Sequence, residues 1–209
     1  MNMRRVNGLI LAAAVVSSVS CGSVVRDGSS PVYLVVDEML ASRGNTTPGP
    51  FVGNLVSDVL TMITSPAPCA PETPCPTIFN DLGQVTLRIS PKDLGPPGTT
   101  TAPSLNNEVT ITHYSVVYRR SDGRNTPGVD VPQPFNGGIT GTIPSGGNRT
   151  LGFELVRHIA KKETPLIDLA VNQRLIQVTA EVTFYGRDQV GNQINAKGFI
   201  VIDFGNFGD

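Results

Sequence analysis

The stretch that decides the fold is RLIQVTAEVTFYG, residues 174–186. Apolar residues at every second position, from Ile176 to Phe184, alternate there with polar ones. Strict alternation places one face of an extended chain against a core and the other in water, so this stretch is predicted to be a β-strand. Shorter runs of the same alternation predict strands at 32–36 and 84–90.

Other stretches are predicted to be strands from less regular patterns. Within residues 106–120 the apolar parity shifts, and a bulge near His113 would let both apolar sets point inward. Residues 198–204, GFIVIDF, are almost continuously apolar, as in a strand that is covered on both faces or lies centrally in a sheet. Residues 51–63 also fit a helical stripe, but their β-branched residues favour a strand. Residues 151–155 predict a further short strand.

The composition agrees with many short strands. The 209 residues include 22 Gly and 17 Pro, and turn-forming residues in such numbers favour short strands over long helices. With 39% hydrophobic and 16% charged residues the chain belongs to neither the disordered nor the coiled-coil class. A net charge of −1 lacks the basic excess that nucleic-acid binding requires, so no nucleic-acid partner is expected.

These elements predict a mainly β chain. One or two helical turns are expected at 156–163, ending before Pro165. Long connections rich in Pro and Gly are expected at 66–76, 91–107 and 122–138. Seven to nine strands with no long helix predict a single antiparallel two-layer β-sandwich with long loops. Two smaller sandwiches are the alternative.

The first twenty residues have the pattern of an export signal. In MNMRRVNGLILAAAVVSSVS, residues 1–20, two arginines precede an apolar run at 9–16 and then small residues. The run is too short to cross a bilayer, which takes about 20 residues. With Cys21 directly after it, this segment resembles the leader of a bacterial lipoprotein, whose cysteine is lipidated and becomes the mature N-terminus. Ser18 stands where that family usually has leucine, and Ser-Val-Ser also suits ordinary secretory cleavage.

The resemblance to lipoproteins implies a cellular location. Acyl chains on Cys21 would hold the protein to a membrane of the cell envelope, facing the periplasm or at the outer membrane where the cell has two membranes. Residues 21–30 are then the lipidated cysteine and a flexible tether, and the globular domain occupies 31–209.

The other two cysteines are expected to pair. A disulfide between Cys69 and Cys75 leaves Cys21 as an odd thiol, for which lipidation supplies a use. The loop-entropy model gives such a small ring up to about 2.4 kcal/mol. The actual gain is smaller because Pro71 and Pro74 already restrict the unfolded chain.

The last predicted hairpin carries a second resemblance. Residues 178–204 read as two strands joined by a turn that contains Asp188, Gly191 and Asn192. The segment resembles the final hairpin of bacterial immunoglobulin-like and fibronectin-type domains, where a D-x-x-G-N turn joins the last two strands. The resemblance implies an immunoglobulin-like β-sandwich over 31–209 and no particular activity.

Residue chemistry accounts for this turn without a ligand. Gly191 and Asn192 accept positive φ, and the Asp188 side chain can accept hydrogen bonds from turn amides. Calcium binding by Asp188 and Asn192, or by Asp37 with Glu38, is the alternative, although the spacing of an EF-hand loop is missing.

The remaining candidates for a site are aromatic or basic. Tyr114, Tyr118 and Tyr185 would form an aromatic platform for a sugar or peptide if exposed together, and would be ordinary strand aromatics if buried. His113 and His158 have no partners at ligand spacing, so packing roles and no metal site are expected. The helical turns are expected to present a solvated face with i,i+4 charge pairs. Its basic residues lie near Glu154 and Glu163 and are Arg157, Lys161 and Lys162.

The sequence therefore predicts a lipid-anchored envelope protein that is a non-catalytic binding or scaffolding module with a protein partner in the envelope. Motifs of nucleophilic enzymes, zinc proteases and phosphate-binding loops are missing from the sequence, so neither catalytic residues nor a cofactor are predicted. The alternatives are a hydrolase-like enzyme with a site on its loops, and an adhesion module that binds calcium or sugar.

Overall fold

The alternating stretch around residue 180 forms β9, one of the longest strands of the computed structural model. The structure describes residues 30–47, 49–93 and 107–208, so the predicted signal peptide, Cys21 and residues 22–29 of the tether lie outside the described residues. The elements are β1 (Val32–Ser42), β2 (Asn54–Asp58), β3 (Thr61–Ile63), β4 (Cys75–Thr77), β5 (Asp81–Pro91), β6 (Val109–Arg119), β7 (Phe135–Ile143), β8 (Asn148–Val156), α2 (His158–Lys161), η2 (Ile167–Ala170), β9 (Ile176–Asp188) and β10 (Gln193–Gly205).

The mainly β class is confirmed, and every stretch predicted to be a strand contains one. The helical turn expected at 156–163 is α2. Residues 51–63 divide into β2 and β3. The structure differs at β7, whose first residues were expected in a loop, because its sequence FNGGITGTI is too rich in glycine to show a strand pattern.

The strands form two main sheets and one small one. The first sheet has the order β1-β5-β8, the second β2-β10-β9-β6-β7, and β3 pairs with β4 separately. Neighbouring described strands are antiparallel except β2, which runs parallel to β10. The expectation of a purely antiparallel fold is therefore wrong at this pair. The reason is that β2 is reached from the other sheet by a connection rather than by a hairpin, so adjacency along the chain does not set its direction.

The two main sheets pack face to face around one cluster of buried side chains. The rings of Phe153 on β8 and Phe184 on β9 meet across this core with centroids 5.3 Å apart. Along β9 every second residue from Val178 to Phe184 is buried, as the alternation predicts. β10 lies between β2 and β9, but it is not covered on both faces, since Phe199 is 57% exposed.

The bulge predicted near His113 is confirmed. The register of β6 against both β7 and β9 shifts between Ile111 and His113. Because of this extra residue, Ile111 and Tyr114 both point into the core, while Thr112 and His113 both lie on the outer face. Gly137 on β7 leaves room for the ring of Tyr114, which a methyl group at that position would overlap.

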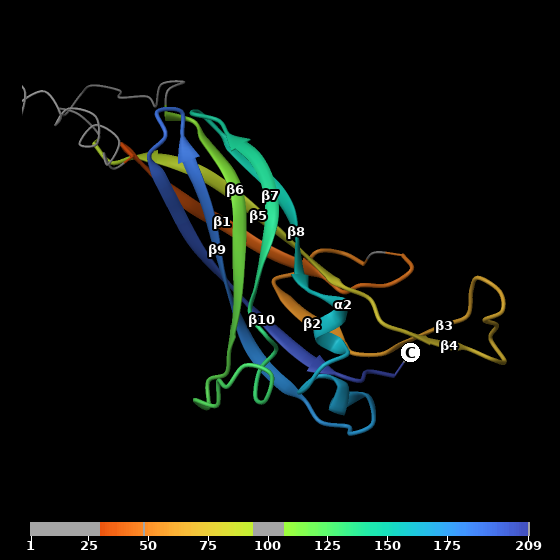
Figure 1. Ribbon diagram of the computed structural model, residues 1–209. Helices are drawn as coiled ribbons and strands as arrows, with labels where there is room; N and C mark the ends of the chain where they lie inside the picture. The colour runs from red at the N-terminus through yellow and green to blue at the C-terminus, as the bar shows by residue number, and fades with distance from the viewer. Residues whose placement is uncertain (1–29, 48, 94–106, 209) are drawn as a thin grey trace, which may run out of the picture.

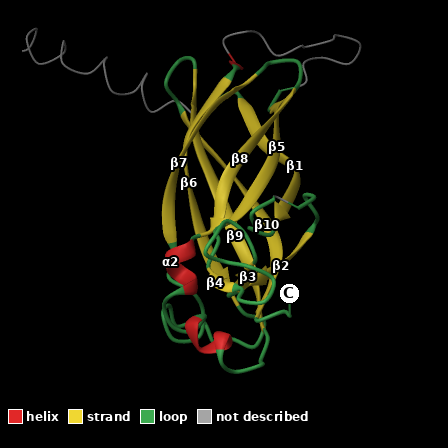
Figure 2. Ribbon diagram, turned by 90° about the vertical axis from the view of Figure 1, so that its right-hand side faces the viewer, coloured by secondary structure: helices red, strands yellow, loops and turns green. Residues whose placement is uncertain are grey.

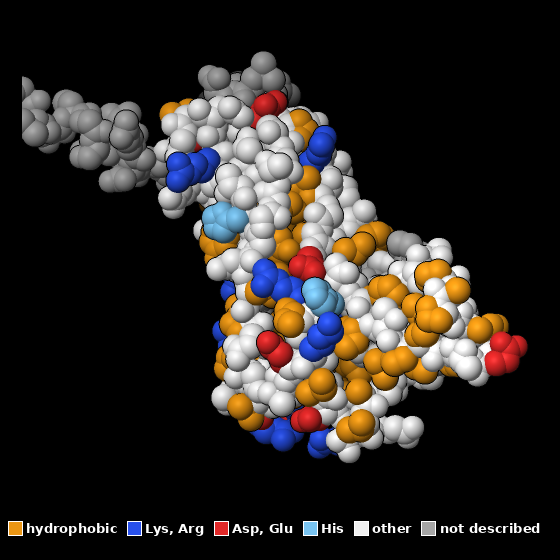
Figure 3. Space-filling model, turned by 45° about the vertical axis from the view of Figure 1, so that its right-hand side comes forward, with side chains coloured by type: hydrophobic (Ala, Val, Ile, Leu, Met, Phe, Trp, Pro, Cys, Tyr) orange, Lys and Arg blue, Asp and Glu red, His pale blue; other side chains and the backbone are white. Residues whose placement is uncertain are grey.

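The two ends of the body differ (Figure 1). The described chain begins at the upper end, where β9 and β10 are joined by their turn, and the C-terminus lies at the lower end. The two short helices and the β3–β4 sheet lie at the lower end as well (Figure 2). Figure 3 shows hydrophobic side chains gathered toward this end, where Met62, Ile159 and Val171 are exposed. In the described part of the chain, no helix is long and apolar enough to cross a membrane.

Candidate functional site

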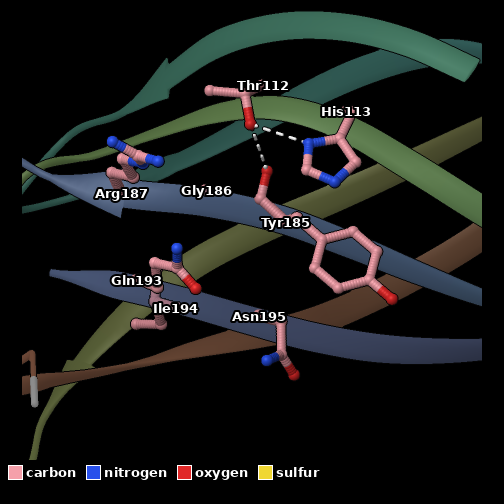
Figure 4. Close-up of a pocket in the computed structure, with 8 residues that line it drawn as sticks. All are labelled: Thr112, His113, Tyr185, Gly186, Arg187, Gln193, Ile194 and Asn195. Carbon is pink, nitrogen blue, oxygen red and sulfur yellow. Dashed lines mark hydrogen bonds between the residues drawn. The ribbon is translucent and has the colours of Figure 1, made fainter.

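A shallow hollow opens on the outer face of the five-stranded sheet, beside the bulge of β6 (Figure 4). It has a volume of about 360 Å³. Its walls come from β6, β9 and β10, and the lining residues are Thr112, His113, Tyr185, Gly186, Arg187, Gln193, Ile194 and Asn195.

Strand register brings these residues together. His113 on β6 lies opposite Tyr185 on β9, which in turn lies opposite Asn195 on β10. Two residues along, Arg187 lies opposite Gln193. Outward-facing positions of neighbouring strands are close enough for their side chains to interact. The cross-strand row of His113, Tyr185 and Asn195 and the pair of Arg187 and Gln193 therefore border the hollow on the surface of the sheet.

The two rings of the hollow are held in place. The imidazole of His113 stacks on the phenol of Tyr185, with centroids 4.6 Å apart and planes 7° from parallel. Thr112 Oγ1 lies 3.0 Å from His113 Nδ1 and donates a hydrogen bond to the backbone carbonyl of Tyr185, at 3.3 Å. The Thr112 hydroxyl thus lies between the imidazole nitrogen and the carbonyl oxygen, and both contacts hold it in place. At the other ring, the Tyr185 hydroxyl lies 3.4 Å from Ser115 Oγ.

Three polar side chains of the hollow are exposed to solvent. Among the described residues, the side chains of Arg187, Gln193 and Asn195 are exposed and form none of the observed side-chain hydrogen bonds or ion pairs. Arg187 is the only residue of the lining with a permanent charge, and no carboxylate is part of that lining. Figure 4 shows Arg187 and Gln193 on one side of the hollow and the two rings on the other. The site thus offers a guanidinium, two amides and a fixed aromatic pair to solvent.

Of the two alternatives for the three tyrosines, the aromatic platform does not form. Tyr185 lines the hollow, but Tyr114 and Tyr118 are only 3% and 2% exposed and face the core. The bulge of β6 turns both inward, where the Tyr114 hydroxyl donates to the carbonyl of Glu154 and accepts from its amide. Tyr118 donates to the carbonyl of Leu155, and burial raises the pKa of the Tyr118 hydroxyl, so it remains a donor. These tyrosines join the two sheets.

The turn between β9 and β10 has the predicted chemistry. One carboxylate oxygen of Asp188 accepts hydrogen bonds from the amides of Val190 and Asn192, and the other accepts from the Asn192 side chain. Burial alone would raise the pKa of Asp188, but hydrogen bonds from Asn192, Ser30 and Val190 outweigh it and lower the pKa. Gly191 has a φ of +99°, whereas Asn192 does not have the positive φ that was expected.

The structure gives the calcium alternative no support at either predicted pair. The oxygens of Asp188 are taken by the turn, and Asp37 forms an ion pair with Arg88 at 2.6 Å. Within residues 30–47, 49–93 and 107–208, no three His, Cys, Asp or Glu residues are grouped so as to hold a metal ion. His158 lies exposed on α2.

The predicted disulfide is formed. Cys69 and Cys75 are bonded, with Cα atoms 5.4 Å apart, and they staple the loop between β3 and β4. Tertiary contacts of the β3–β4 sheet with the rest of the fold are few, so this disulfide acts locally.

A buried polar cluster was missed. Lys161 was expected on a solvated face, but its side chain is 1% exposed, and Nζ lies 2.9 Å from both carboxylate oxygens of Asp81, which is itself fully buried. Asp81 also accepts hydrogen bonds from Ser57 Oγ at 2.6 Å and from the amide of Gly44 at 2.9 Å. These four residues come from separate segments of the lower end, so their meeting had no signal in the sequence.

Sequence reasoning also missed the hollow, of whose lining it named only Tyr185 as a candidate binding residue. The one sequence signal of the hollow was the shift in apolar parity that predicted the bulge at His113. Its chemistry suits recognition of a polar ligand with a ring: the rings supply a flat apolar surface, and the amides and guanidinium supply hydrogen bonds.

Comparison of the chain with protein-family models, with curated protein sequences and with solved structures finds no match in any of the three.

Proposed function

We propose that this chain is an exported, lipid-anchored envelope protein whose immunoglobulin-like sandwich is a non-catalytic binding module. The strand order supports the fold part of this proposal. Immunoglobulin-like sandwiches place strands A, B and E in one sheet and strands C, F and G in the other. The sheets β1-β5-β8 and β7-β6-β9-β10-β2 contain this arrangement, with β7 extending the second sheet beyond C and β2 added beside β10.

The hollow beside His113 is the observation that carries the binding role. Its side chains stand on three hydrogen-bonded strands, which position them more rigidly than loops would. The stacked rings are fixed by hydrogen bonds before any ligand arrives, and such preorganisation reduces the entropy lost on binding.

The same hydrogen bonds argue against catalysis at this position. A nucleophilic hydroxyl needs a neighbouring base that accepts its proton and a third group that orients the base. The Thr112 hydroxyl instead donates to a backbone carbonyl, that of Tyr185. The lining of the hollow holds no carboxylate to orient His113.

The position of the chain ends is consistent with an anchor at Cys21. The first described residue, Ser30, lies nine positions after Cys21, and a chain of that length reaches about 30 Å at most. The hollow includes Gln193, the first residue of β10, and so lies toward this same end. A ligand bound there would be held near the membrane, while the lower end with Met62 and Val171 would face away and receive a protein partner.

The anchor is tested by mass spectrometry of the protein from isolated membranes. We expect a mature chain that begins with diacylated Cys21, and we expect Cys21→Ser to remain unprocessed at full mass. A wild-type chain whose Cys21 carries no acyl group, or a Cys21→Ser variant that is cleaved at the same position as the wild type, contradicts the anchor.

The binding role is tested by site-specific photo-cross-linking in intact cells. A photoreactive residue replaces Asn195 in the hollow or, as the control, Arg149, which is exposed on the opposite sheet. We expect an adduct from position 195 and none from position 149. Equal yields at both positions contradict a binding role for the hollow.

A further inference from the structure

We infer that the hollow beside His113 binds an acidic saccharide, a sugar ring that carries a carboxylate. This inference deepens the proposed binding function and rests on it. It names the ligand class from the groups that the hollow offers: one guanidinium, two side-chain amides and a fixed aromatic pair.

The charge of the ligand follows from Arg187. The chain as a whole has a net charge of −1, so attraction of an anion has to come from a local group. Arg187 is exposed, and among the described residues no acidic side chain is paired with it. Guanidinium groups bind carboxylates through two parallel hydrogen bonds, so a carboxylate is the partner that satisfies Arg187.

The ring and hydroxyl groups of the ligand follow from the remaining residues. Each amide of Gln193 and Asn195 offers a donor and an acceptor side by side, which matches the neighbouring hydroxyls of a sugar. The stacked rings of His113 and Tyr185 offer apolar surface to the ring carbons. An acidic peptide would use Arg187 but would leave these amides and rings without a matching role.

The space beside His113 is open toward β7. Gly138 on edge strand β7 lies opposite His113, and a methyl group added there would touch nothing. The volume of about 360 Å³ lies at the small end of the range for ligand pockets, about 300–1,000 Å³. The hollow therefore suits one part of a chain of sugars whose other units extend across the sheet.

The test is calorimetric titration of the purified full-length mature protein in detergent. The acidic probes are tetragalacturonic acid and a hyaluronan tetrasaccharide, the neutral probe is the matching galactose tetrasaccharide, and tetraglutamate is the non-sugar anion. We expect at least one acidic sugar to bind tenfold or more tightly than the neutral sugar. Tetraglutamate should bind more weakly than this acidic sugar and more weakly than the neutral sugar. No binding of either acidic sugar at 10 mM overturns the inference, as does tetraglutamate binding as tightly as the acidic sugar.

Variants separate the roles within the site. Arg187→Gln should remove the tenfold preference for the acidic sugar, while Tyr185→Ser should weaken the acidic and the neutral sugar alike. Arg149→Gln, the same charge change on the opposite sheet, should leave all affinities unchanged. Thermal unfolding of each variant verifies folding, and Gln193→Ala provides a second exposed position if Tyr185→Ser fails to fold.

An Arg187→Gln variant that keeps the preference overturns the inference. Failure of the ligand class is distinguishable from failure of the proposed function. Photo-cross-linking at position 195 without any response to acidic sugars refutes only the saccharide, whereas a Cys21 that carries no lipid refutes the anchor whatever the titrations show.

Discussion

Replacing Lys161 with Met tests the buried cluster at the lower end of the fold. The side chains of Lys161 and Asp81 are 1% and 0% exposed, and Lys161 Nζ lies 2.9 Å from each carboxylate oxygen of Asp81. Met has a similar length and no charge, so the substitution removes the ion pair with little change in volume. It leaves the Asp81 carboxylate buried with two remaining donors, the Ser57 hydroxyl and the Gly44 amide.

The expected loss is about 3 kcal/mol of unfolding free energy. Removing one member of a buried ion pair costs about 3–5 kcal/mol because the remaining charge is uncompensated. The hydrogen bonds from Ser57 and Gly44 still stabilise the charge, which places this site at the lower end of that range. For a domain of this size, each kcal/mol lowers the melting temperature by about 2–4 °C, so Lys161→Met should lower it by about 6–12 °C.

Urea denaturation and thermal scans of the mature protein measure this difference. Lys162→Met is the matched control, because Lys162 is the next residue and is exposed, and it should change stability by less than about 0.5 kcal/mol. The double variant Lys161→Met with Asp81→Asn should be more stable than Lys161→Met alone, since it no longer buries an unpaired charge. If Lys161→Met unfolds like the control, the reasoning about a buried ion pair is refuted.

Three further substitutions test other parts of the structure. Asp188→Asn should lower the unfolding free energy by about 1–2 kcal/mol at pH 7. Because folding lowers the pKa of Asp188, its contribution to stability is present above the unfolded pKa of about 3.9 and is lost as the pH falls through the folded pKa. Urea denaturation should therefore show the unfolding free energies of the two proteins converging below pH 4. Gly137→Ala should destabilise by about 1–3 kcal/mol because its methyl group overlaps the ring of Tyr114, while Gly138→Ala on the outer face should not; equal melting temperatures would contradict this packing. Tyr118→Phe should cost about 1–2 kcal/mol in chemical denaturation by leaving a buried carbonyl on β8 without its donor, and an unchanged midpoint would show that this hydrogen bond is not made.

The strands of this protein were predictable because alternation is a local property. Each of β1, β5, β8 and β9 carries its own pattern, and the bulge of β6 was visible as a change of parity at His113. The exception was β7, where glycines replace the apolar residues that would have marked a buried face. Those glycines have a tertiary cause: Gly137 makes room for Tyr114 and Gly141 for Leu151.

The candidate site was not predictable to the same extent, because it depends on register. Tyr185 was singled out as an aromatic, but its partner in the sequence pattern, Tyr114, lies on the other side of the sheet. The residues that actually surround Tyr185 come from β6 and β10, and only the pairing of these strands places them there. A shift of one residue in either strand would turn every side chain to the opposite face.

The sequence by itself determined the class of the fold, the positions of most strands, the turn at Asp188 and the pairing of Cys69 with Cys75, since each depends on residues close together in the chain. Only the tertiary structure decided that β2 runs parallel to β10, that Lys161 is buried on Asp81, and that His113, Tyr185 and Arg187 share one hollow. These features join segments that are far apart in sequence. Their free energies depend on packing and burial between segments, and no local pattern records such contacts.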